Sequence, residues 1–158
     1  MSRGSKQAPK REIQPDPVYG SVVVAKFINN LMWGGKKSLA TRIFYDALEI
    51  VEKKTDKKGI DVFNNAIKNV SPSLKVRSRR IGGANYQVPM EVKKDQKVVF
   101  AIKWILGVVR AKKGRSTPEE LAEELILASD NQGGAIKKKE DTHKMAESNR
   151  AYAHFGRY

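Results

Sequence analysis

Basic side chains recur through residues 72–90, where the chain has no acidic group. The segment carries Lys75, Arg77, Arg79 and Arg80. A guanidinium binds phosphate through two parallel hydrogen bonds and also stacks on exposed nucleobases, so this row predicts a polyanionic ligand. Tyr86, beside the row, either packs on an apolar face opposite Ser78 or stacks on a base.

Three further basic groups lie far from this row in the sequence. They are Arg3, Lys6, Lys10 and Arg11 in a proline-containing arm, then Arg110, Lys112, Lys113 and Arg115, then Lys137, Lys138, Lys139, Lys144 and Arg150. A helix that binds a membrane surface carries its cations along one amphipathic face. Because these cations lie on an arm, a loop and a helix instead, the sequence predicts a folded RNA as partner and no membrane.

The composition supports this prediction and excludes several classes of site. The chain has 158 residues, with 31 Lys and Arg against 17 Asp and Glu, a net charge of +14 and a pI of about 10.0. The lack of Cys excludes disulfides and cysteine-ligated metals, and with only two His a metal centre made of several histidines is excluded as well. No apolar run reaches the roughly 18 residues of a membrane span, and residues 1–19 lack the apolar stretch of a secretory signal. We expect a soluble, cytoplasmic protein with one hydrophobic core.

No catalytic motif fits the sequence. Gly35-Lys36-Lys37-Ser38 resembles a phosphate-binding loop, but that loop needs Gly where this chain has Asn30 and Ser or Thr where it has Lys37. Asp141 and His143 would point to different faces of one helix, so they do not make a catalytic triad with Ser148. We therefore predict no enzyme activity, no metal site and no cofactor.

Hydrophobic periodicity predicts a mainly helical fold. Apolar residues recur at three- and four-residue spacing from about Ser21, through residues 38–54 and again from Ile60 to Val70. A helix that is apolar nearly all round follows. We expect Asp95 to cap it, its end at about Lys112, and its place at the centre of the bundle. Thr117-Pro118-Glu119-Glu120 predicts a capping box for the next helix, whose glutamates we interpret as structural.

Residues 74–90 alternate with period two around Gly82-Gly83, which predicts a β-hairpin. A two-residue turn would pair Arg79 with Tyr86 and mix charged and apolar groups on each face. A three-residue turn, from Ile81 to Gly83, would pair Val76 with Val88 and Arg77 with Gln87, which separates an apolar face from a basic one. We expect the three-residue turn.

The last segment is polar and basic. Its few apolar residues, such as Ile136, Met145 and Phe155, form a stripe too thin to hold a helix on the domain, so we expect a partner to help hold it. The sequence thus divides into a basic arm over residues 1–19, a helical core over 20–134 with the hairpin at about 73–91, and a polar, basic C-terminal helix and tail over 135–158.

Two long segments resemble a known family. Residues 76–90, VRSRRIGGANYQVPM, and residues 141–155, DTHKMAESNRAYAHF, are similar to the hairpin and the C-terminal segment of the small-subunit ribosomal protein seven family of bacterial type. Asp16-Pro17 before Tyr19 and Gly35-Lys36-Lys37 before the second helix agree in order and spacing, so the resemblance covers essentially the whole chain. The chain departs from the family at Trp33-Gly34 and over residues 156–158.

The resemblance implies a six-helix, bundle-like core with a protruding two-stranded antiparallel β-hairpin and basic extended termini. It implies a structural constituent of the small ribosomal subunit, a primary binder of ribosomal RNA in the 3′ major domain that nucleates assembly of the head. The hairpin would face messenger RNA and exit-site transfer RNA, and the C-terminal helix would meet RNA, ribosomal protein eleven and other head proteins. Alternatives are a basic DNA-binding regulator, or translational repression of its own operon as a secondary role.

The residues predicted to contact RNA come from the arm, the Gly35 turn, the hairpin, the second basic group and the C-terminal helix. In the arm they are Arg3, Lys6, Lys10 and Arg11, and at the Gly35 turn Lys36 and Lys37. In the hairpin they are Lys75, Arg77, Arg79, Arg80, Gly82 and Gly83. The second basic group contributes Arg110, Lys112, Lys113 and Arg115, and the C-terminal helix contributes Lys137, Lys138, Lys139 and Arg150.

Overall fold

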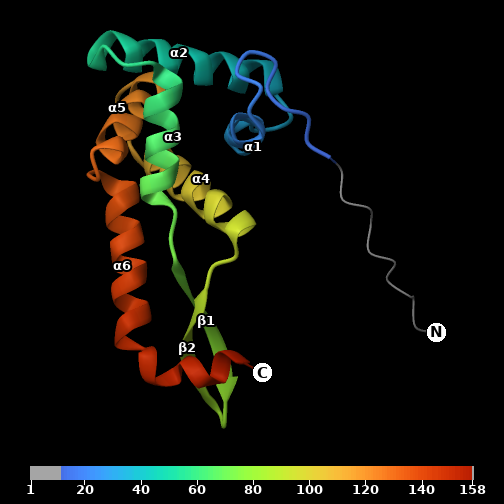
Figure 1. Ribbon diagram of the computed structural model, residues 1–158, viewed down its shortest axis with the longest axis vertical. Coiled ribbons are helices and arrows are strands. Elements are labelled where there is room, and N and C mark those ends of the chain that lie inside the picture. The colour runs from blue at the N-terminus through green and yellow to red at the C-terminus, as the bar shows by residue number, and fades with distance from the viewer. Residues whose placement is uncertain (1–11, 158) are drawn as a thin grey trace, which may run out of the picture.

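The computed structural model, which describes residues 12–157, places a helical body at one end of a long axis and a β-hairpin at the other (Figure 1). The mainly helical fold with a hairpin is thus confirmed. The elements in chain order are α1 (Val22–Leu31), α2 (Lys37–Thr55), α3 (Gly59–Val70), β1 (Leu74–Ile81), β2 (Ala84–Glu91), α4 (Lys94–Ala111), α5 (Thr117–Ser129), α6 (Gly134–Ser148) and the 3₁₀ helix η1 (Arg150–Arg157).

Three phenylalanines from three helices form the centre of the core. Phe27 of α1, Phe44 of α2 and Phe63 of α3 are fully buried, and their ring centroids lie 5.3–5.4 Å apart. Phe63 meets both other rings edge to face, a geometry that adds about 0.5–1.5 kcal/mol per pair beyond the burial of apolar area. The periodic apolar residues of these helices therefore face one core, as predicted.

The α4 helix is central, and it contacts α1, α3, α5 and α6. Its residues Ile102, Ile105 and Val109 are buried, whereas Phe100 and Trp104 are half-buried. The helix begins after Lys93, so the expectation that Asp95 caps it is wrong. Asp95 lies in the first turn, where a carboxylate interacts favourably with the positive end of the helix dipole.

The capping box of α5 lies one residue earlier than predicted. Ser116 is the N-cap, and its N–H donates to Oε2 of Glu119 at 3.3 Å. Glu120 is therefore free of the cap and turns inward with Glu124, and the two residues are 7% and 0% exposed. The Nζ of Lys112 lies 3.4 Å from the Glu120 carboxylate and 3.6 Å from the Glu124 carboxylate. These contacts support the structural interpretation of the glutamates.

Two glycines bring the start of α6 close to α4 and α5. Oε1 of Glu124 accepts the N–H of Ala135 at 2.8 Å, and a Cβ on Gly133 would lie 3.0 Å from that oxygen. A Cβ on Gly134 would lie 2.9 Å from a methyl group of Val108. Small residues let α6 pack closely on its own chain, where Ala135 and Ala146 are buried. The expectation that a partner helps to hold this helix stays a prediction.

The hairpin lies where it is predicted, but the expected register is wrong by one residue. Arg77 pairs with Val88 and Arg79 with Tyr86, so the turn consists of Gly82 and Gly83 alone. Both glycines have positive φ, 57° and 92°. A two-residue turn of this kind matches the right-handed twist of the strands, and its geometry outweighs the separation of polar and apolar faces.

This register mixes basic and apolar side chains on one face of the ribbon. Strand residues alternate between faces, so Arg77 and Arg79 share a face with their partners Val88 and Tyr86, and Arg80 lies on the opposite face. Val88 is nevertheless fully buried, on a strand that both η1 and α6 contact.

The C-terminal segment folds back across the hairpin (Figure 1). The ring centroids of Tyr152 and Phe155 lie 4.9 and 6.0 Å from that of Tyr86. Nη1 of Arg79 donates to the carbonyl oxygen of Phe155 at 3.0 Å. The expectation of an extended C-terminus is therefore wrong over residues 150–157, because the aromatic side chains of η1 find an apolar surface on β2.

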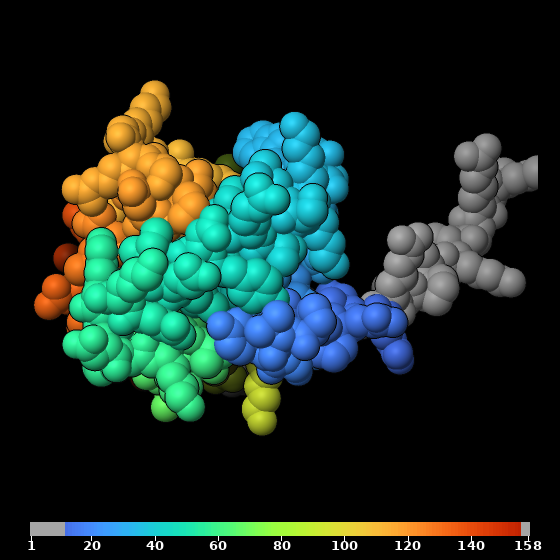
Figure 2. Space-filling model, turned by 90° about the horizontal axis from the view of Figure 1, so that it is seen from above, coloured from blue at the N-terminus to red at the C-terminus, as the bar shows by residue number. Residues whose placement is uncertain are grey.

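The residues before α1 are fixed to α2 through one buried carboxylate. Asp16 is 4% exposed and accepts the N–H groups of Val18 and Tyr19 at 3.1 and 3.0 Å and the hydroxyl of Tyr45 at 2.8 Å. Burial, together with the bond to Asp16, raises the pKa of Tyr45 to about 12. Viewed from the α2 end, these residues lie beside α2 (Figure 2). The part of the predicted arm from Asp16 to Tyr19 is thus bound to the body, whereas residues 12–15 are exposed.

Candidate nucleic-acid interface

The hairpin presents two guanidinium groups and an exposed glycine turn. Arg77 and Arg80 are exposed, as are Gly82 and Gly83. The turn lies at the opposite end of the long axis from α2 (Figure 1). Arg77 and Arg80 lie on opposite faces of the ribbon. Since η1 packs on the face of Arg77 through Tyr86 and Arg79, the face of Arg80 is the one that η1 leaves open to a polyanion.

Two other basic residues of the hairpin have partners within the protein. Nζ of Lys75 donates to Oε1 of Gln96 at 2.9 Å and lies 5.8 Å from the ring centroid of Phe100. Arg79 is bound to the carbonyl oxygen of Phe155. Tyr86 packs against η1, as in the alternative that kept its ring within the protein, although its cross-strand partner is Arg79 and not Ser78.

The turn between α1 and α2 lies next to the end of α4. Lys36 and Lys37 are exposed at the start of α2. From α4, Nη2 of Arg110 donates to the carbonyl oxygens of Asn30 and Leu31 at 2.9 and 3.3 Å, and its guanidinium lies 5.3 Å from the ring centroid of Trp33. The structure thus brings together two predicted basic groups that are far apart in the sequence.

The loop between α4 and α5 contains both paired and exposed cations. Lys112 contacts the buried Glu120 and Glu124, and Nη1 of Arg115 lies 2.7 Å from Oε2 of Glu123. Lys113 is exposed. Since an exposed ion pair contributes little free energy, Arg115 can exchange its carboxylate for a phosphate at low cost, whereas Lys112 is held by its buried partners.

On α6 the three consecutive lysines differ in their contacts. Lys137 and Lys138 are exposed, whereas Nζ of Lys139 donates to the carbonyl oxygen of Asn69 in α3 at 2.6 Å. Arg150, after the helix, makes an exposed contact with Glu147 at 3.3 Å. The predicted arm residues Arg3, Lys6, Lys10 and Arg11 lie outside the described residues.

His143 of α6 lies against the residues that lead into β1. Its Nε2 accepts the N–H of Ser73 at 3.1 Å. Burial, then the charge of Lys139, lowers the pKa of His143. Within the described residues 12–157 no group of three or more metal-ligating side chains meets, and no helix there is long and apolar enough to cross a membrane.

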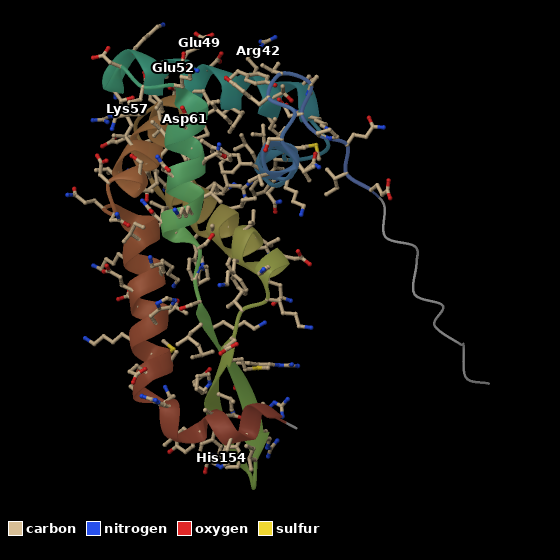
Figure 3. The ribbon with its side chains drawn as sticks, in the orientation of Figure 1. Arg42, Glu49, Glu52, Lys57, Asp61 and His154 are labelled. Atoms are coloured by element: carbon tan, nitrogen blue, oxygen red, sulfur yellow. The ribbon has the colours of Figure 1, made fainter. Side chains whose placement is uncertain are left out.

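Two features were missed in the sequence. Lys93, Lys94 and Lys97 gather at the start of α4, near the base of the hairpin, where three lysines in five residues were the available signal. The contact between Trp33 and Arg110 joins residues 77 positions apart, so no local pattern indicates it. In contrast, the outer face of α2 carries Arg42, Glu49 and Glu52, a mixture of charges with no net basic character (Figure 3).

Comparison with known proteins shows the family of the chain. The family described as ribosomal protein S7p/S5e matches residues 2–150. The small ribosomal subunit protein uS7 of Fervidobacterium nodosum is 55% identical over 150 residues, which cover 95% of this chain and 97% of the relative. That of Thermotoga maritima has the same identity and coverage. That of Natranaerobius thermophilus is 57% identical over 148 residues, 94% of this chain and 95% of the relative. The chain therefore belongs to the ribosomal protein S7 family.

Proposed function

We propose that this chain is a primary binder of ribosomal RNA that nucleates the head of the small subunit and extends its hairpin toward messenger and exit-site transfer RNA. Membership of the family makes it a structural, non-catalytic protein of the small subunit in the bacterial cytoplasm. One observation gives the main support for the proposed binding of RNA: exposed cations lie on four separated elements. They are Lys36, Lys37, Arg77, Arg80, Lys113, Lys137 and Lys138.

The helical body is the part proposed to bind the 3′ major domain of the RNA. The α1–α2 turn and the α4–α5 loop follow two helix ends that meet there, since Arg110 of α4 donates to the carbonyl oxygens of Asn30 and Leu31 at the end of α1. Phosphate groups bind such cations with release of counterions, a term that supplies much of the affinity. Several cations on two neighbouring loops suit an RNA junction, where backbones of different helices approach one another.

The hairpin is the part proposed to reach messenger RNA and exit-site transfer RNA. It lies at the far end of the long axis (Figure 1), so an RNA at its turn need not be the one bound by the body. The α6 helix is proposed to meet RNA, ribosomal protein eleven and other head proteins. The cations Lys137 and Lys138 and the 46% exposed side chain of Met145 support this assignment.

The test compares two charge-reversed variants in RNA binding and in assembled subunits. Arg77→Glu with Arg80→Glu alters the hairpin, and Lys54→Glu with Lys57→Glu makes the same change of charge at the α2 end (Figure 3). We expect the parent chain to protect the 3′ major domain from hydroxyl radicals, and the hairpin variant to retain this footprint but to lose crosslinks to exit-site transfer RNA. The α2 variant should keep both.

Salt dependence provides a second measurement. Affinity should fall steeply with ionic strength, and each phosphate contact removed should lower the log–log slope by roughly one. An affinity that ignores salt, or a chain that protects no part of the 3′ major domain, would refute the proposal. The DNA-regulator alternative is tested by competition, and duplex DNA that displaces the bound RNA at matched salt would favour it.

A further inference from the structure

We propose that the pocket beside Trp33 binds an unpaired nucleobase of the small-subunit ribosomal RNA. The inference rests on the proposed function, since it names one contact within that RNA-binding surface.

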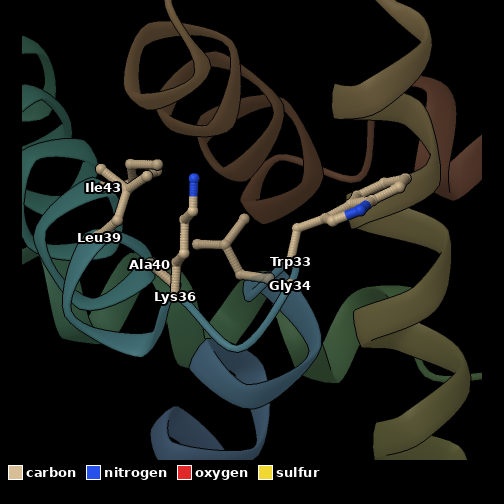
Figure 4. A pocket seen from close by; sticks show the side chains of 7 residues that line it. Trp33, Gly34, Lys36, Leu39, Ala40 and Ile43 are labelled. Carbon is tan, nitrogen blue, oxygen red and sulfur yellow. The ribbon is translucent and has the colours of Figure 1, made fainter.

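The pocket lies between the α1–α2 turn and the first turns of α2 (Figure 4). Its volume is about 420 Å³, which falls in the range of roughly 300–1,000 Å³ typical of small-molecule sites. In Figure 4 the indole of Trp33 points toward α4, and the side chains of Lys36 and Ile43 lie on the other side of the pocket. The lining is apolar apart from the ammonium group of Lys36.

Trp33 is held in position although it is not part of the core. It is 76% exposed, the highest value among the large apolar side chains that are exposed in the described chain. The guanidinium of Arg110, itself fixed by two backbone carbonyls, lies over the indole ring. One contact of this kind leaves most of the indole in solvent, so a flat, apolar ligand can stack on the part that Arg110 does not cover.

The charges around the pocket favour a nucleotide over a peptide. Lys36 lines the pocket, Lys37 follows it, and Arg110 lies on the indole, whereas no acidic residue is among those lining it. A base stacked on an aromatic ring brings a phosphate on either side, which these cations can neutralise. An apolar peptide would fill the same space but would bring no negative charge to these cations.

The position of the pocket identifies the RNA. It lies in the helical body, and the hairpin turn is at the other end of the long axis (Figure 1). The ligand is therefore a base of the RNA bound by the body, the ribosomal RNA, and not of messenger or transfer RNA at the hairpin. A base in a loop or bulge is required, because a base within a duplex does not expose its face.

The experiment uses tryptophan fluorescence of the full chain. Trp33 and Trp104 are its only tryptophans, so Trp104→Phe makes Trp33 the sole emitter. On titration with RNA of the 3′ major domain, we expect the Trp33 emission to be quenched by stacking. In filter binding at fixed salt, Trp33→Leu should raise Kd roughly 5- to 100-fold, whereas Trp33→Phe, which keeps a ring, should raise it less.

The outcomes separate this inference from the function on which it rests. Unchanged Trp33 emission in a saturated complex, or equal Kd values for Trp33→Leu and Trp33→Phe, would overturn the inference while RNA binding stands. Quenching that needs a second head protein would overturn it too, because the occupant would then be a protein. If the parent chain binds no 3′ major domain RNA, it is the proposed function that fails. Since Trp33 is largely exposed, circular dichroism should show the same helical content in all variants.

Discussion

Nε2 of His143 accepts the backbone N–H of Ser73 at 3.1 Å, so the middle of α6 is joined to the residue before β1. The N–H of Leu74 points to the same nitrogen at 3.5 Å. Only a neutral imidazole can accept these bonds, because both ring nitrogens of a charged histidine are donors. The link between α6 and the hairpin is therefore sensitive to proton binding.

We expect the protein to lose stability as the pH falls below about 6.5, partly through His143. Burial and Lys139 lower the pKa of His143 in the folded state below its ordinary value of 6.5. The unfolded chain then binds more protons between the two pKa values, so the contribution of His143 is complete above 6.5 and is lost as the pH falls through the lowered value.

Urea denaturation of the parent and of His143→Ala at several pH values measures this contribution. The variant should show a shallower dependence of its unfolding free energy on pH than the parent. A parent and a His143→Ala variant with the same dependence would contradict the assignment.

Removal of the ammonium group of Lys112 should destabilise the fold. Glu124 has no exposed area, and the Oε2 atoms of Glu120 and Glu124 have Lys112 as their nearby charge partner. Lys112→Met leaves two buried carboxylates without a cation, and we expect a loss of about 1–3 kcal/mol by urea denaturation. Lys113→Met, next along the chain and exposed, should change stability by less than about 0.5 kcal/mol. Equal effects would show that the buried cluster contributes nothing.

Two glycines in helices should respond in opposite ways to alanine. A Cβ on Gly59 would lie 2.8 Å from the carbonyl oxygen of Leu48, which belongs to the backbone of α2. Gly59→Ala should therefore cost about 1–3 kcal/mol. Gly107 is exposed in the middle of α4, with nothing near its Cβ position, so Gly107→Ala should stabilise the protein by about 0.5–1 kcal/mol. Thermal unfolding of both variants decides, and a stabilised Gly59→Ala would contradict the close approach of α3 to α2.

Loss of the Arg79 side chain should release η1 from the hairpin. Its bond to the carbonyl oxygen of Phe155 is the hydrogen bond from β1 to η1 among the described residues. We expect Arg79→Ala to speed hydrogen exchange of the amides of residues 150–157, while the exchange of α3 and α4 stays slow. Arg77→Ala removes an exposed guanidinium from the same face and should leave η1 unchanged. If both variants exchange alike, aromatic packing alone holds the segment.

Helices were predictable because their signal is local and redundant. Phe27, Phe44 and Phe63 each lie in a repeating apolar stripe. Because several residues form each stripe, the predicted helix does not depend on any one of them. The hairpin itself was also local, since Gly82-Gly83 interrupts a period-two pattern. The register of the hairpin could not be predicted in this way, because two rules disagreed. The separation of polar and apolar faces favoured a turn of three residues, whereas the twist of the strands favoured a turn of two glycines.

The residues proposed to bind RNA were chosen from the sequence by their type, and their contacts could not be predicted in the same way. Arg77 and Arg80 are exposed as a binding role requires, whereas Arg79, an arginine that lies between them in the sequence, is bound to Phe155. Nothing near Arg79 in the sequence indicates a partner 76 residues away. The contact of Arg110 with Trp33 could not be predicted for the same reason, since long-range pairs depend on how whole helices cross.

The hairpin is braced at both ends by the same C-terminal stretch. His143 fixes the segment that enters β1, and Phe155 meets Arg79 near the turn. A force that bends the ribbon at its tip is therefore carried into α6 and from there into α3 and α4, instead of being absorbed by two isolated strands. If the RNA proposed at the glycine turn moves, the displacement would be transmitted mechanically to the helices that α6 contacts.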